Sequence, residues 1–206
     1  MVVLNKHYWD LNYSEPKTID GIGNAKDHSR YLSAFFNIEG IQITGIIDLG
    51  FGTGHLFKEM LRTFKPIRAA GLEPSTYIFK KFKAPKGVQI FNQDILSWAK
   101  TKNKTTYDLA LCTSVLQYLS DQELKVALPV IARRVSYLYL TVPTDVEYRR
   151  QKSELKFSDP YARIRTRKQY LKLLAPHFTF LSTRILESKH FYDEDNTPFN
   201  DLLFRF

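Results

Sequence analysis

Short apolar runs alternate with helical patterns along this chain. Apolar runs of strand length occur at residues 43–49, 68–72, 88–91, 109–113 and 137–142. Apolar positions with helical spacing follow the first run at residues 55–64, and Ser75 is a good N-cap for a short helix at 76–82. Strands separated by helical stretches of roughly ten residues predict βαβ units and a parallel sheet.

Two capping boxes mark the starts of further helices. Ser120 is followed by Glu123, and Thr166 is followed by Gln169 at the same spacing. Pro129 interrupts the first of these helical patterns, so we expect it to end one helix or to lie in the first turn of another. The second helix is expected to end at residue 174.

The C-terminal region has a different order of elements. Apolar runs at residues 178–185 and 201–206 are separated by a polar loop without a helical pattern, which favours a closing antiparallel hairpin. The sequence therefore predicts a single α/β domain over residues 1–206. We expect a Rossmann-like, seven-stranded, mostly parallel sheet at 41–206, with helices on both faces, preceded by a helical extension or lid at 1–40.

Composition narrows the class of protein. The chain has 206 residues, of which 44% are hydrophobic and 25% charged, and these values exclude collagen-like, coiled-coil and extensively disordered proteins. It contains no apolar run long enough to span a membrane and no visible secretory signal. Cys112 is the one cysteine, and the histidines lack metal-ligand spacing, so we expect a cytoplasmic protein without disulfides or a metal site.

Positive charge is concentrated in two segments. The net charge is +9, and residues 58–104 carry 11 basic against 3 acidic side chains, while residues 149–172 carry 9 against 2. Such clusters favour anionic partners such as nucleic acid, phosphorylated metabolites or anionic lipid. A solvated surface that binds nothing is the simpler explanation of the same clusters.

A glycine-rich turn carries the main functional signal. Residues 48–54 read D-L-G-F-G-T-G and stand where the first strand turns into a helix, at the edge of a parallel sheet where ligands bind. Glycines there let a ligand approach the backbone. Glu73 follows Gly54 by 19 residues at the end of the next strand, where a carboxylate can accept hydrogen bonds from ribose hydroxyls. Together these features predict a site for a nucleoside-containing ligand.

Glycine spacing separates two classes of ligand. A dinucleotide fold would have G-x-G-x-x-G, which would place the third glycine at position 55, but His55 stands there. With D-x-G-x-G-x-G at its first turn, the chain resembles the class I S-adenosylmethionine-dependent methyltransferases. The segments GLEPS, NQDIL and YDLALCTSVLQYL resemble the ribose-binding, adenine-binding and strand-four motifs of that family. The resemblance covers roughly residues 40–206.

The resemblance implies S-adenosylmethionine as the cofactor and assigns roles to individual residues. Asp48 would reach the amino end of the cofactor, Glu73 would hold the ribose, and Asp94 would accept from the adenine amino group. The complete set of cofactor-binding residues that the resemblance implies is Asp48, Gly50, Phe51, Gly52, Gly54, Glu73, Pro74, Asp94, Ile95, Thr113 and Ser114.

The methyl acceptor is less well defined. Many relatives that act on small molecules have histidine where this chain has Gln117 and Tyr118, so no catalytic residue is assigned, and Tyr118 is a candidate only for substrate binding. Arg163 and Arg165 flank Ile164 and would point to one side of an extended segment, where they could hold a phosphate or carboxylate of an anionic methyl acceptor.

Three functions are consistent with the sequence. The main hypothesis is a methyltransferase acting on a small-molecule acceptor, because methyl transfer from a sulfonium needs positioning more than a strong base. A tRNA or rRNA methyltransferase would use the basic clusters and bind RNA in a salt-dependent way. A non-catalytic nucleoside-binding module with the same fold would show cofactor binding without turnover.

Overall fold

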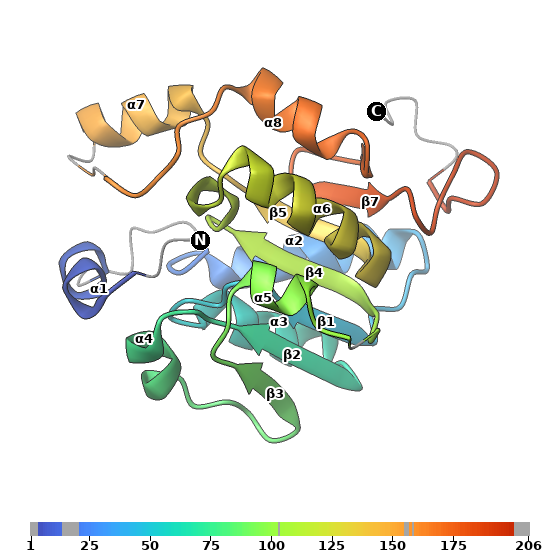
Figure 1. The fold of residues 1–206 in the computed structure, drawn as a ribbon. Coiled ribbons are helices and arrows are strands. Elements are labelled where there is room, and N and C mark those ends of the chain that lie inside the picture. The colour runs from blue at the N-terminus through green and yellow to red at the C-terminus, as the bar shows by residue number, and fades with distance from the viewer. Residues whose placement is uncertain (1–3, 14–20, 103, 155–156, 158, 200–206) are drawn as a thin grey trace.

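The computed structural model describes residues 4–13, 21–102, 104–154, 157 and 159–199. Its elements form an alternating α/β chain with an N-terminal pair of helices and a C-terminal pair of strands (Figure 1). In chain order they are α1 (Lys6–Asn12), α2 (Ala25–Ile38), β1 (Gly45–Asp48), α3 (His55–Phe64), β2 (Arg68–Leu72), α4 (Thr76–Lys81), β3 (Val88–Phe91), α5 (Ile95–Ala99), β4 (Tyr107–Thr113), a 3-10 turn (Leu116–Tyr118), α6 (Asp121–Arg134), β5 (Val135–Thr141), α7 (Asp145–Glu154), α8 (Arg167–Leu174), β6 (Phe178–Phe180) and β7 (Ile185–Ser188).

The seven strands form one sheet in the order β3-β2-β1-β4-β5-β7-β6. Pairing is parallel from β3 through β5, whereas β7 is antiparallel to β5, and β6 is antiparallel to β7. The predicted fold class, a mostly parallel seven-stranded sheet with an antiparallel end, is confirmed. The carboxyl ends of the parallel strands therefore share one edge, beside α1, α4 and α7 (Figure 1).

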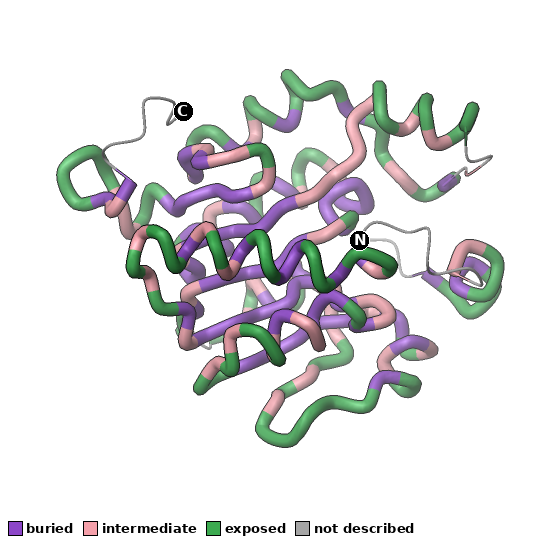
Figure 2. The backbone as a smooth tube through the Cα atoms, turned by 180° about the vertical axis from the view of Figure 1, so that it is seen from behind, coloured by how far each residue is buried: buried purple, intermediate pink, exposed green. Residues whose placement is uncertain are grey.

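Both faces of the sheet are covered by helices. Along β4, Leu109 and Leu111 pack with α2 and α3, while Ala110 and Cys112 pack with α5, α6 and α8. This alternation is the two-residue period of a strand buried on both sides. Figure 2 shows the result as a buried central sheet between helices whose outer faces are exposed.

Helix α2 belongs to the covering layer rather than to a lid. Its Leu32 and Phe36 are fully buried, and Phe36 packs against Tyr137 of β5 with ring centroids 5.1 Å apart. Of the region expected as an extension or lid at 1–40, α1 is the described part that lies beyond the carboxyl ends of the strands (Figure 1). Within the described ranges, no helix is long and apolar enough to cross a membrane.

Both predicted capping boxes are present, but the prediction for Pro129 is wrong. Ser120 and Thr166 each accept from the N3 backbone, and the N3 side chains reach back to them. Helix α6 runs through Pro129 to Arg134 without interruption. A proline there leaves the carbonyl of Lys125 without its helical donor, and this is tolerated because Lys125 is exposed to water.

The C-terminal hairpin differs from the expected one. The run at 178–185 is not a single strand: β6 and β7 pair with each other across a turn at 181–184. Ser182 makes this turn because its Oγ accepts from the backbone N–H groups of Arg184 and Ile185 at 3.3 and 3.1 Å. The strand expected at 201–206 lies outside the described residues.

Candidate active site

The glycine loop between β1 and α3 depends on close backbone packing. Asp48 at the end of β1 accepts from the Gly50 N–H at 3.1 Å, which fixes the first bend of the loop. A Cβ on Gly50 would lie 2.6 Å from Val115 Cγ2, and a Cβ on Gly54 would lie 2.1 Å from Phe82 Cε2. These positions therefore require glycine because neighbouring side chains already fill the space.

Glu73 joins this loop to the end of β2. One carboxylate oxygen accepts from the Gly52 N–H at 2.9 Å, and the other accepts from the Ser75 N–H at 2.8 Å. The Asn92 amide at the end of β3 donates to the Glu73 carbonyl at 2.8 Å and keeps the turn in place. A carboxylate has about four lone-pair sites, so Glu73 retains acceptor capacity for a ligand.

Burial raises the pKa of both carboxyl groups in this region. The pKa of Asp48 is raised from 3.8 to about 8, mainly by burial, with the Gly50 N–H opposing and nearby Glu73 adding to the rise. The pKa of Glu73 is raised from 4.5 to about 7 by burial, against the hydrogen bonds from Ser75 and Gly52. Both carboxylates would be stabilised in their ionised form by a cation.

A hollow of about 860 Å³, including its open mouth, lies over the glycine loop. Ser114 at the end of β4 has a left-handed φ of +55°, an uncommon conformation for a residue with a side chain. The lining residues are Leu4, Trp9, Tyr13, Gly21, Ile22, Asp48, Gly50, Phe51, Gly52, Thr53, His55, Leu56, Glu73, Pro74, Thr113, Ser114, Val115 and Tyr118.

Helix α1 covers the hollow through Trp9. A Cβ on Gly52 would lie 3.3 Å from Trp9 Cη2, so the indole lies directly on the glycine loop. Trp9 is 7% exposed, and its Nε1 has no hydrogen-bond partner among the described residues. A buried indole N–H normally finds an acceptor. An oxygen atom of a bound ligand would satisfy it.

Tyr118 lines the hollow and is tied to a buried carboxylate behind it. Its hydroxyl donates to Asp159 Oδ2 at 2.6 Å, and the Tyr8 hydroxyl of α1 donates to the same oxygen at 2.9 Å. The two phenolic oxygens are 3.0 Å apart. All three side chains are less than 9% exposed. Asp159 therefore links α1 to the turn that follows β4.

The structure brings most of the sequence-predicted site residues to this hollow. Nine of them line it: Asp48, Gly50, Phe51, Gly52, Glu73, Pro74, Thr113, Ser114 and Tyr118. Gly54 lies next to it as the N-cap of α3, in the left-handed region at φ +75°.

Asp94 and Ile95 do not line the hollow. Asp94 is the N-cap of α5, where its side chain accepts from the Ser97 N–H at 2.7 Å. The Ile95 side chain is fully buried in the core. Their adenine contacts stay a prediction, which for Ile95 involves only the backbone.

Arg163 and Arg165 do not form the expected pair of guanidiniums. Arg165 is buried and donates to Asp121 at 2.8 Å and to the Leu119 carbonyl at 2.6 Å, whereas the Arg163 side chain is exposed. Alternation in an extended segment does not decide the outcome here because one partner, Asp121 at the start of α6, holds Arg165.

Sequence reasoning assigned no site role to Asp159, and it expected an extension or lid at 1–40 without placing α1 on the glycine loop. The aromatic residues Tyr8, Trp9 and Tyr13 were visible as an unusual cluster before the sheet, but their position depends on contacts with the turn after β4. Asp159 follows a segment that has no periodic pattern, so only the folded chain reveals it. Within the described residues, no group of three potential metal ligands occurs.

Comparisons with known proteins agree with this geometry. Residues 46–136 match the model of a family described as "Methyltransferase domain". Among curated proteins, none matches the sequence significantly.

Several solved structures share the fold at low sequence identity. An S-adenosylmethionine-dependent methyltransferase from Clostridium acetobutylicum is 12% identical, with 88% of this chain and 96% of that chain covered and a TM-score of 0.62. The magnesium protoporphyrin IX methyltransferase from Synechocystis, crystallised with S-adenosylhomocysteine, is 16% identical, with 89% and 96% covered and a TM-score of 0.56. A plantazolicin methyltransferase in complex with a triazolic substrate analogue is 14% identical, with 83% and 68% covered and a TM-score of 0.63.

The fold is shared with these solved S-adenosylmethionine-dependent methyltransferases, and residues 46–136 match a methyltransferase domain. Two of these solved structures, the magnesium protoporphyrin IX methyltransferase and the plantazolicin methyltransferase, contain S-adenosylhomocysteine.

Substituting Gly54 tests the packing of the glycine loop. The control is Gly87→Ala, which has no atom within 4 Å of the added Cβ. It should destabilise the protein by about 1–2 kcal/mol because the φ of Gly87, +84°, is left-handed. Gly54→Ala should cost about 1–3 kcal/mol more, because Phe82 must also move. Urea denaturation of both variants measures the difference, and equal losses would contradict the proposed contact.

The raised pKa of Asp48 predicts a pH-dependent stability. Protonated Asp48 stabilises the ligand-free fold at low pH, and this contribution is lost as pH rises from about 4 through its folded-state pKa of about 8. The free energy of unfolding of Asp48→Asn should therefore fall less steeply than that of the parent protein between these pH values. Urea denaturation at a series of pH values checks this, with Asp195→Asn in an exposed loop as the control that should keep the parent slope.

Proposed function

We propose that this protein binds S-adenosylmethionine over its glycine loop and transfers the methyl group to a small molecule that enters beside Tyr118. The proposal rests on one observation. The Gly52 N–H of the glycine loop donates to the Glu73 carboxylate, and the Trp9 indole lies against the same glycine. Bare backbone, the Glu73 carboxylate and the unsatisfied Trp9 N–H surround one hollow, and this supports binding of a cofactor that contains a ribose.

The residues present fit the charge and the polar groups of this cofactor. S-adenosylmethionine carries a sulfonium and an ammonium against a single carboxylate, so its net charge is positive. The described lining residues include the carboxyl groups of Asp48 and Glu73, and neither lysine nor arginine is found among them. A cationic ligand would stabilise both carboxylates, whose burial otherwise raises their pKa.

The residues around the hollow would bind the cofactor and position the methyl acceptor. The sulfonium of the cofactor supplies a methyl group that is already activated for displacement. Asp48 holds the amino end, and Glu73 accepts from the ribose hydroxyls while its other bonds keep Gly52 and Ser75 in place. Trp9 excludes water from above the loop, and Tyr118 presents a hydroxyl to the methyl acceptor.

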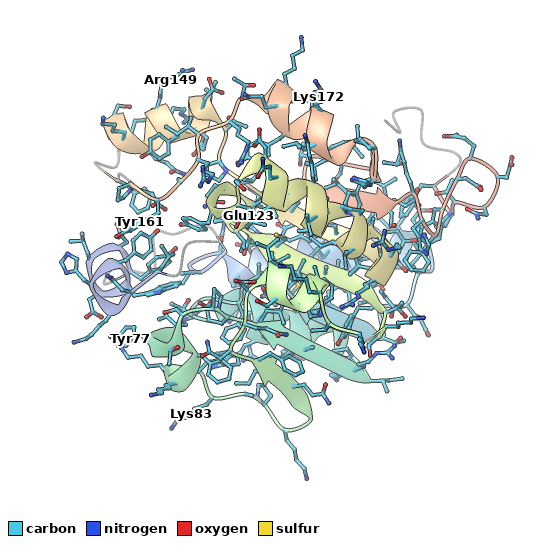
Figure 3. The ribbon with its side chains drawn as sticks, in the orientation of Figure 1. Tyr77, Lys83, Glu123, Arg149, Tyr161 and Lys172 are labelled. Carbon is cyan, nitrogen blue, oxygen red and sulfur yellow. The ribbon has the colours of Figure 1, made fainter. Side chains whose placement is uncertain are left out.

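The distribution of charge favours a small molecule over RNA. On α7, three basic side chains, Arg149, Arg150 and Lys152, are balanced by three acidic ones within Asp145–Glu154. Arg149 pairs with Asp145, and Arg150 lies near acidic side chains of the same helix. Arg149 and Lys172 point outward from α7 and α8 (Figure 3). An RNA methyltransferase stays the alternative, with a steep salt dependence of binding as its expected signature.

A catalytic role and a cytoplasmic location are further parts of this proposal. The joined loop and carboxylate support cofactor binding over a degenerate pocket, and methyl transfer to an acceptor separates an enzyme from a non-catalytic binding module. Cys112 is fully buried inside β4, and this is consistent with a reducing compartment.

Labelled methyl incorporation into a small-molecule extract, rather than into RNA, would support the small-molecule assignment.

Cofactor binding is tested with S-adenosylhomocysteine. At about 100 times its dissociation constant it should raise the free energy of unfolding by about 2.7 kcal/mol. Glu73→Ala should weaken binding by about 1–3 kcal/mol, because ribose hydroxyls lose a buried acceptor. Calorimetry on both proteins measures this, with the exposed Glu154→Ala as the matched control. Tight NAD binding without S-adenosylhomocysteine binding would overturn the assignment.

A further inference from the structure

The hollow is lined by carboxyl groups although the chain as a whole is strongly positive. The net charge of the protein is +9, yet the described lining residues include Asp48 and Glu73 and neither lysine nor arginine, and a bound cation would favour the ionised form of both carboxyl groups. Neither of the two arginines expected near the methyl acceptor lines the hollow: Arg165 is bound to Asp121, and the Arg163 side chain is exposed. The Arg163 backbone N–H donates to the Gln117 carbonyl at 2.8 Å, next to Tyr118. An anionic methyl acceptor would therefore meet repulsion in this hollow, and a cation would be attracted.

Asp159 adds a third negative charge, on the side of Tyr118. Its Oδ2 accepts from Tyr118 and Tyr8, its Oδ1 accepts from the Tyr161 N–H at 2.9 Å, and its carbonyl accepts from the Tyr148 hydroxyl at 2.9 Å. In the described part of the chain, all these donors are neutral, and no ion pair neutralises the carboxylate. Figure 3 shows Tyr161 between α1 and α7, at the same edge of the sheet.

Tyr8 Oη, Tyr118 Oη and Asp159 Oδ2 are in mutual contact, but they share too few protons for every contact to be a hydrogen bond. They make three O···O contacts of 2.6, 2.9 and 3.0 Å, but two phenols bring two protons. Burial, with the Asp159 charge adding to it, raises the pKa of both phenols, so the negative charge stays on the carboxylate. When both phenols donate to Asp159, the 3.0 Å contact has no proton, and Tyr118 Oη is left with lone pairs for another donor.

Aromatic rings surround the place where that donor would enter. Trp9, Tyr13 and Tyr118 line the hollow, and the Trp9 and Tyr13 ring centroids are 4.6 Å apart. Tyr8 packs against both of these rings at 6.0 and 6.3 Å. Aromatic faces attract ammonium ions, and a nearby buried carboxylate strengthens this attraction.

We propose that the methyl acceptor is an amine, which enters as an ammonium ion and donates an N–H to Tyr118 Oη with Asp159 as its counter-charge. The inference rests on the proposed function, since it names the substrate class of the same site. Asp159 acts through Tyr118 and is therefore a positioning residue.

The transfer of protons and electrons balances with these groups. The ammonium passes one proton to Tyr118 Oη while the Tyr118 proton moves to Asp159, which leaves a neutral amine. The nitrogen lone pair then forms the N–C bond, the C–S bond breaks, and its electron pair stays on sulfur. The product is an N-methylammonium ion, and after its release the Asp159 proton returns to solvent.

Three probes of similar shape and different charge test the proposal. We would measure binding of 2-phenylethylamine, 2-phenylethanol and 3-phenylpropanoate to the complex with S-adenosylhomocysteine by calorimetry. The amine should bind about tenfold or more tighter than the alcohol, a difference of about 1.4 kcal/mol, and the carboxylate should bind most weakly. Asp159→Asn keeps one acceptor oxygen but removes the charge, so it should remove most of the amine preference and leave alcohol binding unchanged.

Controls separate a structural effect from the proposed one. Asp195→Asn removes an exposed charge and should change nothing, and Tyr118→Phe should lose amine binding if Asp159→Asn fails to fold. Equal binding of the amine and the alcohol, or no amine binding up to about 10 mM, would overturn the inference. An equal loss for amine and alcohol in Asp159→Asn would overturn it too. The proposed function fails separately, by absence of S-adenosylhomocysteine binding to the parent protein.

Discussion

The carboxylate of Glu73 is the contact on which the site depends. By accepting from Gly52 with one oxygen and from Ser75 with the other, it fixes the turn after β1 relative to the turn after β2. Parallel pairing of these strands already places their carboxyl ends side by side, and the carboxylate sets the distance between the loops that follow them. The backbone at Gly50 can then lie against Val115, and Trp9 can lie on Gly52.

This arrangement has an electrostatic cost that also selects the ligand. Asp48 and Glu73 are both at most 4% exposed, and no basic side chain lines the hollow in the described part of the chain. Buried carboxylates without a cation destabilise the ligand-free fold at neutral pH, and a positively charged ligand relieves this. The buried carboxylates that would bind a cationic ligand therefore lower the stability of the ligand-free protein, a trade-off that is common at functional sites.

Local patterns explain why much of the fold was predictable. The period-two alternation of β4, the glycine spacing of the loop and the capping boxes at Ser120 and Thr166 are all encoded within a few residues. The misplaced features depend on distant contacts or on solvent. Pro129 is tolerated because Lys125, whose carbonyl it leaves without a helical donor, is exposed to water. The run at 178–185 divides because Ser182 supplies a turn.

Most of the candidate site that sequence reasoning predicted belongs to the proposed cofactor side, with Tyr118 as the predicted residue on the other side that also lines the hollow. Asp48, the glycines and Glu73 follow each other at strand ends, so a topology is sufficient to place them together. The other half depends on pairs far apart in the sequence. Tyr8 and Asp159 are separated by 151 positions, and Arg165 is held by Asp121 across 44 positions. No periodicity connects such residues. The spacing of Arg163 and Arg165 therefore predicted a bound anion as their partner, whereas Arg165 is held by Asp121.

Helix α1 connects the two halves physically. On one side its Trp9 rests on Gly52, whose N–H is held by Glu73, and on the other its Tyr8 is bonded to Asp159 and Tyr118. A seven-residue helix is too short to be stable alone, so these contacts must hold it in place. Any change that displaces Tyr8 from Asp159 therefore also lifts the indole from the glycine loop. Trp9 on the glycine loop and Tyr118 beside Asp159 are therefore parts of one packed unit, which under the proposed function would align methyl donor and acceptor when both are bound.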